Sequence, residues 1–194
     1  MNTAQKRSLL IFAVLALVMA GTRFHHFGSV HSLPDASLAV FFLGGIYLAG
    51  KIAFPLLLAE AGLIDYLAIT AGGVSDWCVT PAYGFLVPTY AVMWLAGRFV
   101  SPRASDHIAL RWQSLLPTVG ALFVASSIAF LISNGAFYAL SGYFPELSWT
   151  QYAGRVAKYY PSYVSVAFYY VAFAAFVHWA VASVGALRAS RAGY

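Results

Sequence analysis

The sequence predicts an all-α integral membrane protein whose helices form one bundle. Its 194 residues are 61% hydrophobic and only 9% charged, and the mean hydropathy is +0.76. In a soluble domain about a quarter of the residues are charged, so this composition is typical of a protein embedded in a lipid bilayer. Nothing in the chain marks a second domain, a repeat or a low-complexity tail, and residues 1–194 are expected to form a single transmembrane domain.

The apolar runs set the number of helices. A helix needs roughly 20 residues to cross the hydrocarbon layer. By that measure six transmembrane helices are expected, at about residues 8–22, 36–50, 53–73, 83–100, 114–140 and 160–187. The second run is short, and Lys51 and Pro55 at its end leave open one long kinked segment in place of the second and third spans.

The basic residues predict the orientation. With a cytoplasmic N-terminus, the inner side receives most of them: Lys6, Arg7, Lys51, Arg98, Arg103, Arg111, Arg188 and Arg191. The outer side keeps Arg23, Arg155 and Lys158. We therefore expect a multi-pass protein of the cytoplasmic (inner) membrane with both termini in the cytoplasm. The basic residues form no patch or stripe, so nucleic acid is not an expected partner despite the net charge of +5.

In this orientation the chemically versatile residues gather on the outer side, in or beside the polar inserts 22–35, 74–82 and 141–159. They are His25, His26, His31, Asp35, Asp76, Cys78, Tyr83, Glu146, Arg155 and Lys158. Aromatic residues accompany them, among them Trp77, Phe85, Trp149 and Tyr159. We expect an outward-facing cup with aromatic walls, which suits a large organic ligand. The alternative for any one of these aromatics is a place in the interfacial aromatic belt.

The only cysteine lies in the stretch GGVSDWCVTPAYGF, beside an acid, a tryptophan and a tyrosine. A single cysteine rules out an intramolecular disulfide and a cysteine-only metal cage. Two interpretations stay open for Cys78, a buried inert side chain or one functional thiol. As a thiolate it would be a soft ligand for a transition metal.

Two acidic residues lie inside the third apolar run. Asp65 is in its outer half, where a carboxylate is costly, and we expect it to face the cup and accept hydrogen bonds from ligand amides. Glu60 lies deeper and is expected to be structural, either protonated or paired within the bundle. The glycine pairs 44–45 and 72–73 are expected to serve close helix packing and the turn into the following loop.

The chain contains no G-x-x-x-x-G-K-[ST] phosphate loop, so active transport would need an ATP-hydrolysing partner. The first helix carries a small-xxx-small pair, Ala16 and Ala20, which would let another helix approach closely.

Together these features resemble the S-components of energy-coupling factor (ECF) vitamin transporters, and within them the cobalamin-specific BtuM family. The most specific segments are TRFHHFG, LIDYLAITAG and DWCVTPAYG. The resemblance implies a six-helix bundle that captures cobalamin, with Cys78 as an axial ligand of the corrinoid cobalt. It also implies that Ala16 and Ala20 contact the coupling subunit of a module that contains the ATPases.

Further roles follow from the implied ligand. His25 or His26 would be an alternative cobalt ligand or a donor to the amide rim of the corrin, and Tyr83 would stack on the ring or donate to it. Arg155 and Lys158 would meet the ligand's phosphate, and Trp77 and Phe85 would line the cup. A thiolate on cobalt would also favour loss of cyanide from cyanocobalamin.

Two other functions remain as alternatives. One is a membrane-embedded enzyme with Cys78 as nucleophile and His25 or His26 as base, although no partner motif supports it. The other is a haem or copper carrier, which the absence of an H-x-x-x-H spacing disfavours.

Overall fold

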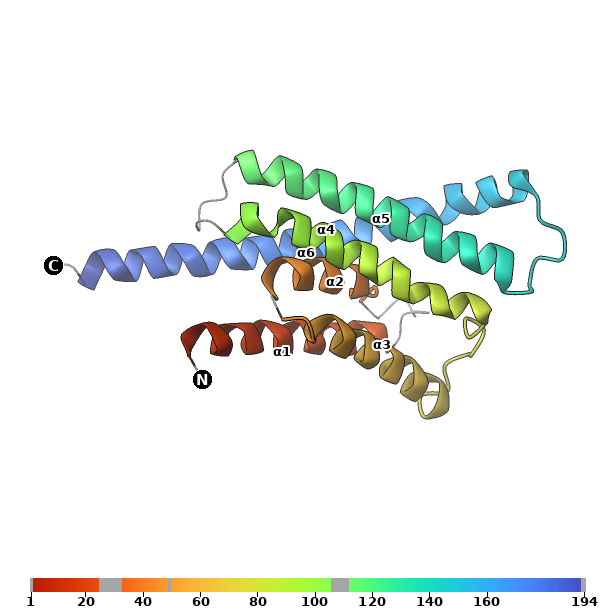
Figure 1. Ribbon diagram of the computed structural model, residues 1–194, viewed down its shortest axis with the longest axis horizontal. Helices are drawn as coiled ribbons and strands as arrows, with labels where there is room; N and C mark the ends of the chain where they lie inside the picture. The colour runs from red at the N-terminus through yellow and green to blue at the C-terminus, as the bar shows by residue number, and fades with distance from the viewer. Residues whose placement is uncertain (1, 25–32, 49, 106–111, 193–194) are drawn as a thin grey trace.

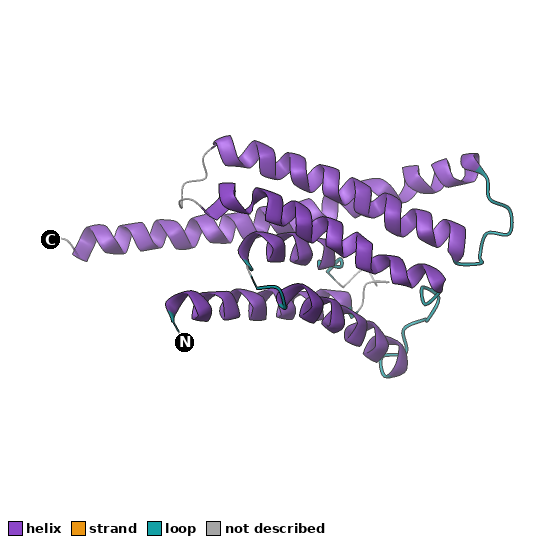
Figure 2. Cartoon of the chain, viewed as in Figure 1, coloured by secondary structure: helices purple, strands orange, loops and turns teal. Residues whose placement is uncertain are grey.

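The computed structural model describes residues 2–24, 33–48, 50–105 and 112–192, without the side chains of 102–105, 112–114 and 186–192. The described residues form helices and the loops that join them, with no β-strand among them (Figures 1 and 2). The elements are α1 (Thr3–Arg23), α2 (Ser37–Tyr47), α3 (Ala53–Thr70), the short 3-10 helix η1 (Pro81–Phe85), α4 (Leu86–Ser105), α5 (Trp112–Leu140) and α6 (Trp149–Ala192).

Four helices of the described chain are long and apolar enough to cross a membrane: α1, α3, α5 from Leu115 and α6 as far as Gly185. The all-helical character and the membrane-length helices agree with the sequence-based expectation. Helix α2 has 11 residues and a length of about 16 Å, roughly half of a hydrocarbon layer. Four helices of the described chain meet the length and hydropathy of a span, so the expectation of six complete spans stays a prediction.

Helix α2 forms the centre of the bundle. Its residues from Ala39 to Ile46 are all buried, and it packs against α1, α3, α4 and α6. The closest approach is to α4, where a Cβ atom on Gly45 would collide with the backbone carbonyl of Trp94, and one on Gly97 with that of Phe42. The predicted packing role of the glycine pair at 44–45 is confirmed, because only glycine allows two helix backbones to come this close.

Helices α2 and α3 are separate, with α2 ending at Tyr47 and α3 beginning at Ala53, so the alternative of one long kinked segment is wrong. Pro55 lies in the first turn of α3, where its missing N–H costs no helical hydrogen bond. Helices α1 and α3 pack side by side and run in the same direction along one edge of the bundle (Figure 1).

Helix α6 begins earlier than the apolar run suggests. The polar insert 141–159 is not a loop throughout, because the helix starts at Trp149 and runs for 44 residues. The segment from Trp149 to Tyr160 contains no proline, and the Tyr152 amide already donates to the Ser148 carbonyl. Arg155 and Lys158 consequently lie on a helix, in fixed positions relative to Pro161 and the rest of α6.

Candidate functional site

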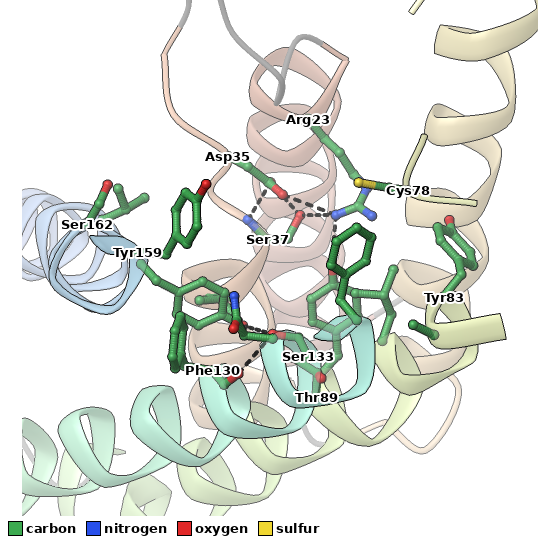
Figure 3. Close-up of a pocket in the computed structure, with 18 of the residues that line it drawn as sticks. Arg23, Asp35, Ser37, Cys78, Tyr83, Thr89, Phe130, Ser133, Tyr159 and Ser162 are labelled. Atoms are coloured by element: carbon green, nitrogen blue, oxygen red, sulfur yellow. Dashed lines mark hydrogen bonds and ion pairs between the residues drawn. The ribbon is translucent and has the colours of Figure 1, made fainter. Parts of the chain in front are cut away.

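A cavity of about 630 Å³ lies at the end of the bundle where α1 and α3 finish and α2 and α4 begin (Figure 3). All six helices and η1 contribute to its wall. Its lining includes Arg23, Asp35, Ser37, Asp65, Trp77, Cys78, Tyr83, Tyr90, Ser133, Asn134, Phe137, Arg155, Tyr159 and Tyr163. Segments far apart in the sequence thus supply one site.

Cys78 lies in the loop between α3 and η1 and is half-buried. Hydrogen bonds within the loop hold its backbone: the Val79 amide donates to the Asp76 carbonyl, and the Thr80 amide donates to the Cys78 carbonyl. Gly73 has φ +67°, a conformation that glycine adopts readily, and it allows the chain to leave α3. The prediction that the pair at 72–73 makes this turn is confirmed. The thiol is therefore presented by a tight, ordered turn.

The environment of Cys78 favours the neutral thiol. Burial raises the pKa of the thiol, and the negative charge of Asp65 raises it further. The side chain is therefore mostly protonated near neutral pH. A metal that bound the sulfur would have to displace the proton, as metal–thiolate bonds generally require.

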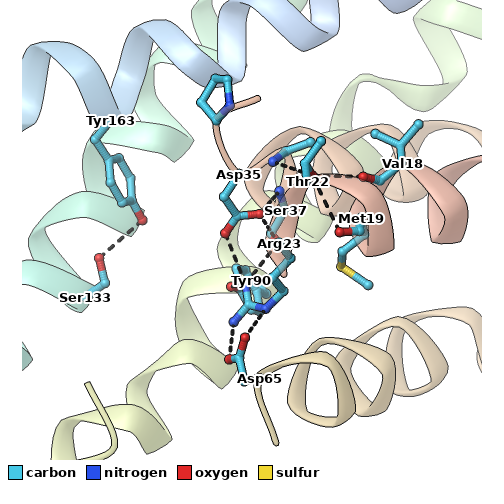
Figure 4. A network of polar contacts seen from close by, with 12 residues as sticks. Val18, Met19, Thr22, Arg23, Asp35, Ser37, Asp65, Tyr90, Ser133 and Tyr163 are labelled. Atoms are coloured by element: carbon cyan, nitrogen blue, oxygen red, sulfur yellow. Dashed lines mark hydrogen bonds and ion pairs between the residues drawn. The ribbon is translucent and has the colours of Figure 1, made fainter. Parts of the chain in front are cut away.

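A buried ion-pair network (Figure 4) contributes to the wall of the same cavity as Cys78. The Arg23 guanidinium donates from Nε to Asp65 Oδ1 at 2.8 Å and from Nη2 to Oδ2 at 2.6 Å. Its Nη1 donates to Tyr90 Oη at 2.6 Å, Ser37 Oγ at 3.0 Å and Asp35 Oδ2 at 3.2 Å. One arginine thereby joins α1, α2, α3 and α4 at the floor of the cavity.

Asp65 lines the cavity, and its oxygens already have protein partners. Besides the two bonds from Arg23, Oδ2 accepts a 2.6 Å hydrogen bond from the Tyr83 hydroxyl. The carboxylate connects the arginine network to η1, which directly follows the loop of Cys78. This arrangement gives Asp65 a positioning role, and a ligand amide would have to share its oxygens with Arg23 and Tyr83.

The opposite wall belongs to α5 and α6 and carries unsatisfied polar atoms. Asn134 Oδ1 and Arg155 Nε are buried without a hydrogen-bond partner among the described residues. The Arg155 guanidinium lies over the rings of Phe144 at 4.6 Å, Tyr159 at 5.3 Å and Phe137 at 5.8 Å. Buried polar atoms normally have hydrogen-bond partners, so this acceptor and this donor are available to a polar ligand or to ordered water.

The remaining predicted site residues lie in different parts of the structure. Trp77 lines the cavity and stacks on Tyr143 at 4.6 Å, whereas Phe85 lies in η1 outside the lining, 40% exposed. His25 and His26 fall outside the described residues. Ala20 is exposed on α1, but Ala16 is half-buried and packs against the core of the bundle. Lys158 is exposed and lies outside the lining, over the ring of Tyr159.

Sequence reasoning missed the central role of Arg23 and the contribution of Tyr90 and Asn134. The sequence did contain a signal for Arg23. Arg23 and Asp65 carry opposite charges, and both lie toward the outer end of an apolar run. Charges in such places usually pair with each other. Nothing in the sequence distinguishes Tyr90 from the other tyrosines, since its selection depends on which face α4 turns inward.

No three His, Cys, Asp or Glu side chains of the described chain lie close enough together to hold a metal ion. Comparison with protein-family models and with curated proteins finds no match.

Proposed function

We propose that this chain binds cobalamin in the cavity, with Cys78 as an axial ligand of the cobalt, and takes it up across the cytoplasmic membrane. The observation that carries the proposal is a single ordered thiol in the wall of a 630 Å³ cavity whose other walls are aromatic and polar. The resemblance of DWCVTPAYG to the corresponding motif of the cobalamin-specific S-components agrees with it.

The donor set suits a metal that arrives inside a macrocycle. A zinc or iron–sulfur site needs three or four protein ligands. The corrin ring occupies the equatorial positions of its cobalt, so one protein side chain is enough at an axial position. Cys78 provides one soft donor of the kind that transition metals accept.

The size and lining of the cavity suit the face of a corrin. Cavities of about 300–1,000 Å³ enclose drug-sized ligands, and a corrinoid is larger. The cavity would therefore hold the cobalt-bearing face, with part of the molecule outside. Trp77 and Phe137 offer flat apolar contacts, while Asn134 and Arg155 would pair with amide or phosphate groups of the ligand.

The ligation step exchanges bonds without any change of oxidation state. The thiol proton passes to solvent or to the ligand's own lower base, the bond from cobalt to that base breaks, and a bond from cobalt to the Cys78 sulfur forms. A strongly donating thiolate weakens the bond on the opposite face. Cyanide would then leave with its bonding electron pair and take up a proton.

Uptake would need an energy source outside this chain, because the sequence has no phosphate loop. We propose that a coupling subunit with its ATPases docks on α1. Ala20 is exposed on that helix, and an ideal Cβ atom built at Gly21 meets no atom within 4 Å, so another helix has room to approach there.

The visible absorption spectrum of the purified full chain tests this function. Protein from cobalamin-fed cells should carry corrinoid bands at near-equal stoichiometry. Added cyanocobalamin should give a shifted spectrum and then slow loss of cyanide. Cys78→Ala should bind weakly or show the unshifted spectrum, whereas Cys78→His should retain binding without cyanide loss, because imidazole ligates cobalt but donates less.

Identical spectra and affinity for Cys78→Ala and the unmodified chain would refute cobalt ligation by the cysteine. Haem bands in the purified protein would favour a haem carrier. If the purified protein is colourless and added cobalamin does not change its spectrum, the alternative of a membrane-embedded enzyme with Cys78 as nucleophile would be favoured.

A further inference from the structure

Glu60 is an acidic residue at mid-depth of a membrane-length helix. Helix α3 has 18 residues and a length of about 27 Å, and Glu60 lies seven residues, about 10 Å, from its first residue. If α3 crosses the bilayer, residue 60 is therefore near the middle of a hydrocarbon layer of about 30 Å. Ionisable groups at this depth are costly, and they normally pair with another group or line a polar path.

The sequence predicts that Glu60 is protonated or paired inside the bundle, and the structure provides no such partner. Among the described residues, Glu60 forms no ion pair and accepts no hydrogen bond. It is not part of the cavity lining, and its side chain is only half-buried. The other acid of this helix, Asp65, is by contrast fully engaged with Arg23 and Tyr83.

Glu60 belongs to the outer stripe of α3. Leu56, Leu63 and Leu67 are 47%, 56% and 43% exposed. Together with Glu60 they are spaced by four, three and four residues, which places all four within an arc of about 60° on the helix. The buried face of α3 is a different one, formed by Leu57, Ala61, Ile64 and Ala68.

Helix α1, which packs beside α3, has a similar outer stripe. Leu10, Val14 and Leu17 are 65%, 49% and 72% exposed, with spacings of four and three residues. The two neighbouring helices run in the same direction (Figure 1). On each of them, exposed apolar residues recur every three or four positions, which is the spacing on which a further helix packs in a left-handed bundle.

We propose that the outer face of α3 docks a transmembrane helix of a partner protein, and that a lysine or arginine at mid-depth of that helix pairs with Glu60. A lipid tail offers no group to pair with the carboxyl, and headgroup amines lie too far from the middle of the layer. A second copy of this chain packed through the same stripe would bring two Glu60 carboxyls together. A cationic partner helix satisfies both the exposed leucines and the acid.

This proposal does not rest on the identity of the ligand in the cavity. Glu60 is absent from the cavity wall, so Glu60→Gln should leave any ligand spectrum unchanged. Failure of cobalamin binding and failure of helix docking are therefore separate results.

The test is site-specific photo-crosslinking of the full chain in native membranes, with the photoreactive residue at position 63. The matched control position is Phe123 on α5, which is also exposed, at 51%. We expect position 63, but not 123, to crosslink to another protein whose membrane helix contains a lysine or arginine. Glu60→Gln should lower the yield about tenfold, in line with the strength of interhelical polar contacts in membranes.

Charge exchange decides whether the acid itself is recognised. Glu60→Lys should abolish the crosslink, and replacement of the partner's basic residue by glutamate should restore it. Crosslinks only to lipid or to a second copy of this chain, a partner without a basic residue in its membrane helix, or an unchanged yield in Glu60→Gln would overturn the proposal.

Thermal unfolding provides a second readout. Because Glu60 has no partner among the described residues, Glu60→Gln should leave the melting temperature unchanged or raise it, as should the control Glu146→Gln in an exposed loop. A lower melting temperature for Glu60→Gln alone would show that the acid is paired within its own chain, and would also overturn the proposal.

Discussion

Replacing Asp65 by asparagine should destabilise the bundle more than any other single loss of an acid. The Asp65 and Arg23 side chains are 7% and 4% exposed and are joined by two short hydrogen bonds. Asparagine keeps one acceptor oxygen but turns an N–H₂ donor toward an Arg23 donor in either orientation of the amide, and toward the Tyr83 hydroxyl as well in one of them. The variant therefore loses the charge pair and leaves at least one buried donor without an acceptor.

The size of the effect follows from burial. Removing one partner of a buried ion pair costs about 3–5 kcal/mol. Asp35 still faces Arg23 at 3.2 Å but is 27% exposed, so it compensates in part, and we take about 3 kcal/mol. For a chain of this length that corresponds to a melting temperature lower by about 6–12 °C.

The assay is thermal unfolding of the purified full chain in detergent, followed by circular dichroism. Asp76→Asn is the matched control, since this acid is exposed in the loop before Cys78, and it should change stability by less than about 0.5 kcal/mol. The double variant Arg23→Met with Asp65→Leu should unfold at a higher temperature than Asp65→Asn, because it leaves no arginine without its main partner. A melting temperature for Asp65→Asn within about 2 °C of the control would refute the assigned role of the network.

Two further predictions concern Cys78 and the orientation of the chain. Burial and Asp65 both disfavour the thiolate, so at pH 8 Cys78 should react with a maleimide more slowly than a cysteine placed at the exposed Ser75 in a Cys78→Ala background. Asp65→Asn should lower the pKa of the thiol and move the rate profile toward lower pH, and an unmoved profile would contradict the assigned electrostatic cause. A cysteine at Ser105 in the Cys78→Ala background should be labelled only from the cytoplasm, and labelling of intact cells from outside would reverse the orientation.

The sequence alone determined that the protein is helical and lies in a membrane, and where glycine pairs allow close packing or a turn. Composition and run length require helices in lipid, because an apolar chain in a bilayer must satisfy its backbone hydrogen bonds internally. The glycine pairs at 44–45 and 72–73 have the packing and turn roles that glycine's missing Cβ allows. Helix α6 begins at Trp149, before the apolar run at about 160–187, because hydropathy marks the lipid-facing part of a helix and not its first turn.

The tertiary structure alone decided which polar residues meet. Arg23 and Asp65 are 42 positions apart, and whether they pair depends on the rotation and depth of α1 and α3. Asn134 and Arg155 face the same cavity only because α5 and α6 turn these faces inward. Glu60 and Asp65 are five residues apart on one helix, a separation of about 140° around its axis. One acid is therefore held inside the bundle by Arg23 while the other is left on the outer stripe, a difference set by the way α3 packs and not by its composition.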